Sequence, residues 1–270
     1  MQLAGPRVFG PPADPAGARA VLRRAVELGV DHIDTAQYYG PDVVNELIRD
    51  ALHPYPAGLR LVSKVGARRD ARGGVLAAPL PDELRAGVEA NLETLQTDSL
   101  TLVNLRLMPP EARGGIPMAE QLGALKSLQD EGKIESIGLS NAGVDEVAAA
   151  LEMVDLGEVQ NAYNIKLRDD EDVLRFCADR DIAYVPFFPI GSSFAGGPKQ
   201  LAEDPTISSV AAKHGATPAQ IALAWLLHKD RHILLIPGTS SLAHLEQNMA
   251  AARITLEDGD LAALDGVSRP

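Results

Sequence analysis

Cysteine and aromatic residues are scarce in this chain of 270 residues. The single cysteine, Cys177, excludes an internal disulfide and a thiolate metal cluster. It lies in a segment with helical periodicity, where we expect it to be a small buried apolar residue. Aromatic residues make up 4% of the sequence, and the one tryptophan, Trp225, lies in an apolar helical segment. We therefore expect Trp225 in the core.

Positive charge is also scarce, with 25 Lys and Arg against 37 Asp and Glu and a formal net charge of −12. This balance argues against nucleic acid or an anionic membrane as the main partner. The six histidines are scattered without metal-ligand spacing, so we expect no metal. We recognise no signal peptide and no apolar run long enough to cross a bilayer, and we expect the cytoplasm as the compartment.

Short apolar runs alternate with longer segments of helical period along the whole chain, and no Pro/Gly/Ser-rich linker divides it. We therefore expect one domain over residues 1–270. The expected strands are Val30–Asp34, Leu59–Ser63, Leu100–Leu105, Ile134–Gly138, Glu158–Gln160, Ile182–Val185 and Ile233–Ile236, with 1–4 as a remnant of an eighth. Helix signals include the cap Asp14-Pro15 and the capping box that starts at Thr217.

Repeated strand–helix units at this length predict an α/β fold, either a (β/α)8 barrel or a doubly wound open sheet. A doubly wound dinucleotide domain would carry a G-x-G-x-x-G turn after its first strand, and the sequence has none. The barrel is therefore the prediction.

Polar or ligand-binding types of residue fall at the carboxyl ends of the expected strands. They are Asp34, Lys64, Arg106, Ser140-Asn141, Gln160, Phe187 and Pro237-Gly238-Thr239. In a barrel, these ends meet at one mouth, where active sites are assembled from several loops. Their shared position predicts a site there.

We expect the group formed by Asp34, Tyr39 and Lys64 to lower the pKa of the tyrosine phenol. A buried ammonium favours the phenolate, a carboxylate holds the lysine, and the tyrosine becomes a proton donor for a carbonyl. Each residue also has a plain structural interpretation: Asp34 as a helix cap, Lys64 as a solvated strand end, and Tyr39 as a turn residue. Their spacing together with the downstream motifs favours the functional interpretation.

The sequence resembles the aldo-keto reductases over essentially its whole length. The motifs that carry the resemblance are Asp34-Thr35-Ala36-x-x-Tyr39-Gly40, Lys64, Gly138-Leu139-Ser140-Asn141, Gln160-Asn161-x-Tyr163-Asn164 and Ile236-Pro237-Gly238-Thr239-Ser240-Ser241. Phrases such as Lys64-Val65-Gly66-Ala67-Arg68-Arg69 and Val103-Asn104-Leu105-Arg106 resemble the bacterial branch that contains pyridoxal reductase. The resemblance implies a (β/α)8 barrel that binds NADPH and reduces aldehydes without a metal. The first candidate reaction is the reduction of pyridoxal to pyridoxine, and the second candidate is the reduction of a broader range of aldehydes.

The resemblance also assigns roles to residues. Tyr39 would be the general acid, with Asp34 and Lys64 tuning it and Arg106 completing the catalytic group. Ser140, Asn141 and Gln160 would hold the nicotinamide carboxamide, and Phe187 would stack on the ring in place of a tyrosine. The adenosine end would be bound by Gly238, Thr239, Ser240, His244, Gln247 and Asn248.

Three departures from the family pattern are visible. Arg106 stands where the family has a catalytic histidine; it either pairs with a substrate anion or turns aside into a structural ion pair. Gly238 and His244 stand where many relatives place cations around the 2′-phosphate, so we expect NADPH to be preferred over NADH only modestly. The third departure is at the start of the chain, where we expect the N-terminal hairpin of the family to be missing and the first strand to be truncated.

An alternative from another class is an NADP(H)-binding sensor or partner subunit with little turnover, which the replacement at Arg106 makes reasonable. Against it, the group Asp34, Tyr39 and Lys64 is intact. The expected partner is a small carbonyl substrate, and the expected oligomeric state is a monomer or a weak homo-oligomer.

Overall fold

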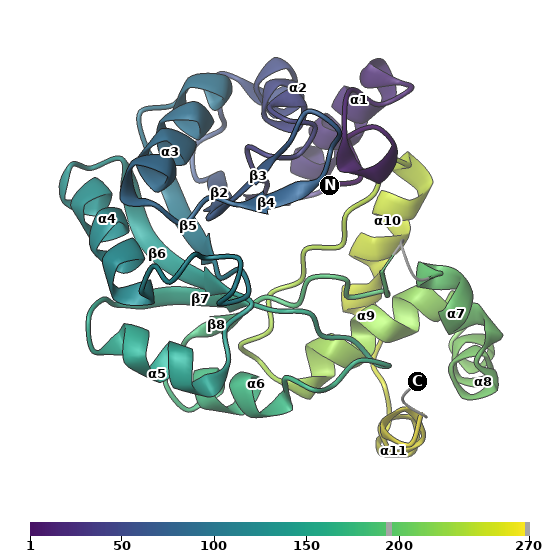
Figure 1. The fold of residues 1–270 in the computed structure, drawn as a ribbon. Coiled ribbons are helices and arrows are strands. Elements are labelled where there is room, and N and C mark those ends of the chain that lie inside the picture. Colours follow the sequence, from purple (N-terminus) through teal and green to yellow (C-terminus); the bar gives the residue numbers. More distant parts are fainter. Residues whose placement is uncertain (193–195, 268–270) are drawn as a thin grey trace. The chain divides into compact units, whose positions relative to one another are not determined.

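The computed structural model describes residues 1–192 and 196–267, which form two compact units (Figure 1). The first unit contains Met1–Val159 and Gly238–Leu242, and the second contains Gln160–Pro237 and the residues from Ala243 onward. The part of the chain that the structure describes has no helix long and apolar enough to span a membrane.

The first unit alternates strands with helices. In chain order its elements are η1 (Pro6–Val8), α1 (Pro15–Glu27), β1 (His32–Asp34), α2 (Val43–Leu52), β2 (Arg60–Val65), β3 (Ala67–Arg69), β4 (Val75–Ala77), α3 (Pro81–Leu95), β5 (Leu100–Arg106), α4 (Met118–Asp130), β6 (Ile134–Ser140), α5 (Val144–Leu151) and β7 (Leu156–Gln160). Strands β1, β2, β5 and β6 pair in parallel in that order. The helices lie outside these strands, and each packs on the next (Figure 1).

Local sequence explains how these elements begin and what they bury. Asp14 caps α1 by accepting a hydrogen bond from the Gly17 amide at 2.9 Å, and Pro15 fixes the first helical residue. The helix buries Ala18, Val21, Leu22 and Ala25, as its periodicity predicts. The parallel strands are apolar and almost fully buried, because helices on one side and side chains on the other exclude water.

The second unit is mainly helical. Its elements are α6 (Glu171–Ala178), β8 (Ala183–Tyr184), α7 (Gly197–Glu203), α8 (Pro205–Lys213), α9 (Pro218–Lys229), α10 (Leu242–Ala250, whose first residue belongs to the first unit), η3 (Ala251–Arg253) and α11 (Asp258–Asp265). Its core contains Trp225, which stacks on Tyr163 at 6.1 Å between ring centroids. Cys177 is fully buried on α6, and burial raises the pKa of its thiol to about 12. Both predictions of core residues are confirmed.

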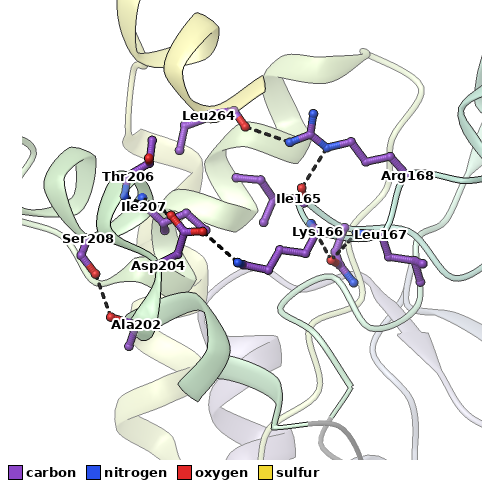
Figure 2. Close-up of polar contacts among 11 residues, drawn as sticks. Ile165, Lys166, Leu167, Arg168, Ala202, Asp204, Thr206, Ile207, Ser208 and Leu264 are labelled. Carbon is purple, nitrogen blue, oxygen red and sulfur yellow. Dashed lines mark hydrogen bonds and ion pairs between the residues drawn. The ribbon is translucent and has the colours of Figure 1, made fainter. Parts of the chain in front are cut away.

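Two cationic side chains, the buried Arg168 and the partly buried Lys166, fix the loop that follows β7 (Figure 2). The Arg168 guanidinium donates to the carbonyl oxygens of Ile165 and Leu264, both at 2.8 Å, and so ties the loop to the end of α11. Lys166 pairs with Asp204 at 2.8 Å, and the same carboxylate caps α8 through the Thr206 and Ile207 amides. The loop that begins at Gln160 is therefore held by ion pairs and hydrogen bonds within its own unit.

Six of the seven predicted strands are confirmed, with ends that differ by a few residues. The seventh prediction, 233–236, is wrong: Ile233 forms only an isolated bridge with Tyr184. Strand β8, which contains the partner Tyr184, is only two residues long. Residues 1–4 form a turn closed by the Ala4 amide on the Met1 carbonyl, so the predicted strand remnant is also wrong. The hairpin β3–β4 was not predicted.

Candidate active site

The strand register places four predicted site residues on one face of the parallel sheet. Lys64 is paired with Asn104 and Arg106 with Ser140, while the register partner of Asp34 lies two residues before Lys64. Partners in a parallel ladder, and residues two apart in a strand, point to the same face. Asp34, Lys64, Arg106 and Ser140 therefore face the same side, at the carboxyl ends of their strands.

Asp34 and Lys64 form a buried ion pair. The Lys64 ammonium contacts Asp34 Oδ1 and donates a second hydrogen bond to the Thr35 carbonyl oxygen at 3.1 Å. The side chains of Lys64 and Asp34 are only 3% and 8% exposed. A buried charge is stable only when it is paired, so each of the two residues requires the other.

A tight turn after β1 brings Tyr39 to this pair. The Tyr39 amide donates to the Ala36 carbonyl oxygen at 2.9 Å. Gly40 has φ = +106°, and a Cβ there would lie 2.5 Å from Val43 Cβ, so only glycine fits. The Lys64 ammonium lies 5.4 Å from the centroid of the buried Tyr39 ring. The structure therefore brings the carboxylate, the ammonium and the phenol together.

The expectation that the pKa of Tyr39 is lowered is wrong for this structure. Burial raises the pKa of the Tyr39 phenol, and the Asp34 carboxylate raises it further. The guanidinium groups of Arg106 and Arg69 act in the opposite direction but do not outweigh burial. Lys64 is paired with Asp34, so the charges of these two groups act on the phenol in opposite directions. The phenol thus keeps its proton at neutral pH, as a proton donor must.

Arg69 and Tyr38 were missed in the sequence analysis. Arg69 lies on β3 and donates through Nε to the Tyr38 carbonyl oxygen at 3.3 Å. The buried Tyr38 ring meets the Tyr39 ring edge to face, with centroids 5.4 Å apart. Asp70 and Gly73-Gly74 favour a turn between the two short strand segments, and this hairpin signal could have revealed Arg69.

A buried polar network supports the ion pair from behind. Asn91 on α3 accepts from Ser63 Oγ at 2.6 Å and from Asn45 Nδ2 at 2.9 Å. Asn45 on α2 in turn accepts from Thr35 Oγ1 at 2.8 Å. Thr35 follows Asp34 in the sequence and Ser63 precedes Lys64, so the network fixes the backbone on which both charged residues stand.

Ser140 fits the role of a ligand to the amide of a nicotinamide ring. Its Oγ is buried and has no hydrogen-bond partner among the residues that the structure describes. A buried hydroxyl without a partner is costly, so a polar ligand there would be stabilising. Asn141 follows with φ = +60° and an exposed side chain, at the point where the chain leaves β6.

Three further cofactor candidates in the first unit follow one another before α10. Gly238 and Ser240 are exposed, and Thr239 is partly buried. Thr239 Oγ1 accepts a hydrogen bond from the Ser241 amide at 3.1 Å, which shapes the turn into the helix.

The second unit carries the other predicted cofactor residues. Gln160 is fully buried at the end of β7. Phe187 is held by its amide, which donates to the Asn161 carbonyl oxygen at 2.8 Å, and its partly exposed ring meets Phe188 edge to face at 5.1 Å.

His244, Gln247 and Asn248 lie on α10 at spacings of three and four residues, which places them on one face of that helix. His244 and Gln247 are exposed. Within residues 1–192 and 196–267, no three His, Cys, Asp or Glu side chains lie close enough to hold a metal ion.

Comparison with known proteins gives a consistent result. The model of the aldo/keto reductase family matches residues 3–269. Pyridoxine 4-dehydrogenase of Escherichia coli K12 is 48% identical over 271 residues, covering 100% of this chain and 93% of the relative. An uncharacterised oxidoreductase of Schizosaccharomyces pombe is 34% identical, covering 98% of this chain and 83% of the relative.

Among solved structures, an aldo-keto reductase of Klebsiella pneumoniae in complex with NADPH is 28% identical, with a TM-score of 0.80 over 98% of this chain and 87% of that chain. A thermostable aldo-keto reductase in complex with the inhibitor epalrestat is 29% identical, with a TM-score of 0.82 over 98% of this chain and 92% of that chain. These similarities confirm the predicted (β/α)8 fold class. The chain therefore belongs to the aldo/keto reductase family and is an oxidoreductase that uses a nicotinamide cofactor.

Proposed function

We propose that the protein reduces an aldehyde to an alcohol with NADPH, and that pyridoxal, giving pyridoxine, is its first substrate. The observation that carries the proposal is the buried Asp34–Lys64 pair beside the Tyr39 phenol. The 48% identity to a pyridoxine 4-dehydrogenase over the full chain supports this choice of substrate. Other small aldehydes are the second candidate class.

In this proposal the bound cofactor supplies the hydride, and the chain supplies a proton and the positioning. Tyr39 donates the proton to the carbonyl oxygen; its raised pKa keeps the phenol protonated until charge develops on that oxygen. The Lys64 ammonium, fixed by Asp34 and Thr35, stabilises the negative charge left on the phenol.

Several residues are proposed to hold the cofactor. Ser140, Asn141 and Gln160 would bind the carboxamide, and Phe187 would offer an aromatic face to the ring. The proposed adenosine-end residues are Gly238, Thr239, Ser240, His244, Gln247 and Asn248. Neither Gly238 nor His244 supplies a fixed positive charge for the 2′-phosphate of NADPH. We therefore propose that the protein prefers NADPH over NADH by only about tenfold, the effect of one charge-assisted hydrogen bond.

We further propose that the 270 residues act as one aldo-keto reductase domain, which the family match over residues 3–269 supports. The protein works in the cytoplasm, and it acts as a monomer or a weak homo-oligomer.

The test is oxidation of NADPH and NADH, followed at 340 nm, with pyridoxal and with several unrelated aldehydes. Turnover that is fastest with pyridoxal and NADPH would support the proposal. Turnover with other aldehydes alone would keep the reaction and reject the substrate. Tight cofactor binding without turnover on any aldehyde would contradict the proposal and favour a cofactor-binding sensor.

A further inference from the structure

The β3–β4 hairpin directs two neighbouring arginines to opposite sides. The hairpin directly follows β2, and its turn is closed by the Asp70 carboxylate, which accepts from the Arg72 and Gly74 amides at 2.8 Å each. Alternation along β3 sends Arg68 outward, where its side chain is 53% exposed and lies 3.9 Å from Glu83. Arg69, the next residue, is sent toward Tyr38.

The Arg69 guanidinium is held in place without being neutralised. Its Nη1 donates to the Gly73 carbonyl oxygen at 2.7 Å and its Nε to the Tyr38 carbonyl oxygen at 3.3 Å. Both partners are neutral carbonyls, and Arg69 makes no ion pair with any carboxylate in the part of the chain that the structure describes. The side chain is partly exposed. A fixed and unneutralised guanidinium has N–H donors suited to an anion.

A second arginine, Arg106, lies on the sheet and acts electrostatically on the Tyr39 phenol. Arg106 ends β5 on the face that carries Lys64, and its side chain is partly exposed. The charges of Arg106 and Arg69 both oppose the rise in the pKa of the Tyr39 phenol, so both guanidiniums lie within electrostatic range of it. Asp34, the acid that raises the pKa of Tyr39, is paired with Lys64. Arg69 and Arg106 therefore add positive charge to the surroundings of Tyr39.

We propose that Arg69, together with Arg106, forms an anion-recognition site beside Tyr39, and that the preferred substrates are aldehydes with a negatively charged substituent next to the carbonyl group. This inference rests on the proposed function and narrows its substrate class. Pyridoxal meets the requirement, because its phenolic oxygen is carried by the ring carbon beside the one that bears the aldehyde. Arg69 is then a specificity-determining residue, and Tyr39 remains the proton donor.

The experiment compares 2-formylbenzoate with its methyl ester, which has the same reacting group but no charge. The variants are Arg69→Gln, Arg69→Lys and, as a matched control, Arg68→Gln, which removes the same charge from the same strand on the other side. We expect Arg69→Gln to lower kcat/KM for 2-formylbenzoate about tenfold or more, mainly through KM, because a charge-assisted hydrogen bond is lost. The ester should change less than about twofold, Arg68→Gln should leave both substrates unchanged, and Arg69→Lys should restore part of the loss.

A binding measurement keeps the test independent of turnover. Isothermal titration with phthalate should show weaker binding to Arg69→Gln than to wild type and to Arg68→Gln. If Arg69→Gln lowered the rate on acid and ester equally, or left phthalate binding unchanged, the anion site would be refuted while the reductase function stood. If wild type reduced neither these two substrates nor pyridoxal, the proposed function would fail, and phthalate titration alone would decide whether the anion site exists.

Discussion

Asn91 offers the sharpest test of how the fold holds the candidate active site. Its side chain is fully buried on α3 and joins α2, α3 and β2 through three hydrogen bonds. It accepts from Asn45 at 2.9 Å and from Ser63 at 2.6 Å, and it donates to the Gly87 carbonyl oxygen at 2.7 Å. The change Asn91→Ala removes all three and leaves the Ser63 hydroxyl buried without a partner.

The size of the expected stability loss follows from these three hydrogen bonds. Each hydrogen bond contributes about 1 kcal/mol to stability, and a stranded buried hydroxyl costs about 1–2 kcal/mol more. We therefore expect Asn91→Ala to lower the free energy of unfolding by about 4–5 kcal/mol, a large part of the roughly 5–15 kcal/mol of a typical domain. Because Ser63 precedes Lys64, we also expect a lower kcat at temperatures where the variant is fully folded.

Urea unfolding at pH 7, followed by circular dichroism, measures the stability change. Glu93→Ala, on the exposed face of the same helix, is the control and should change stability by less than about 0.5 kcal/mol. A loss of stability below about 1 kcal/mol for Asn91→Ala would show that this hydrogen-bond network does not stabilise the fold as proposed.

Two further predictions concern charged residues. Asp34→Asn leaves the buried Lys64 ammonium without a carboxylate, so we expect the free energy of unfolding to fall by about 3–5 kcal/mol and the activity to be lost. The double variant Asp34→Asn/Lys64→Met should regain stability in the same urea assay but stay inactive. A double variant as unstable as Asp34→Asn would contradict this prediction. The Asp230 and Asp181 carboxylates raise the pKa of His232 in the folded protein. The protonated imidazole therefore contributes fully to the stability of the fold below about pH 6.5, and this contribution is lost as the pH rises through the raised folded-state pKa. The stability difference between wild type and His232→Gln should therefore shrink from pH 6 to pH 9, and a constant difference across that range would rule out titration of His232.

The parallel strands of the first unit could be predicted from the sequence because they are buried on both faces and read as apolar runs. The predicted strand 233–236 reads in the same way, yet its partner β8 is only two residues long and no ladder forms. Strand length depends on the neighbouring segment, which a local pattern does not contain.

The site residues Asp34, Tyr39 and Lys64 were visible in the sequence, and the structure brings them together. Two features were not visible. The raised pKa of Tyr39 comes from burial, which depends on packing rather than on which charges are nearby. The bond between Asn45 and Asn91 joins residues 46 positions apart, and no spacing rule connects them.

The substitution Tyr39→Phe decides whether Tyr39 is the proton donor of a carbonyl reductase. The variant keeps the ring and loses only the hydroxyl, so its fold and its cofactor affinity, measured by titration with NADPH, should match those of wild type. We predict that its kcat for the best aldehyde substrate falls at least a hundredfold, the typical contribution of a positioned acid. A Tyr39→Phe variant that binds NADPH and retains wild-type turnover would contradict the account.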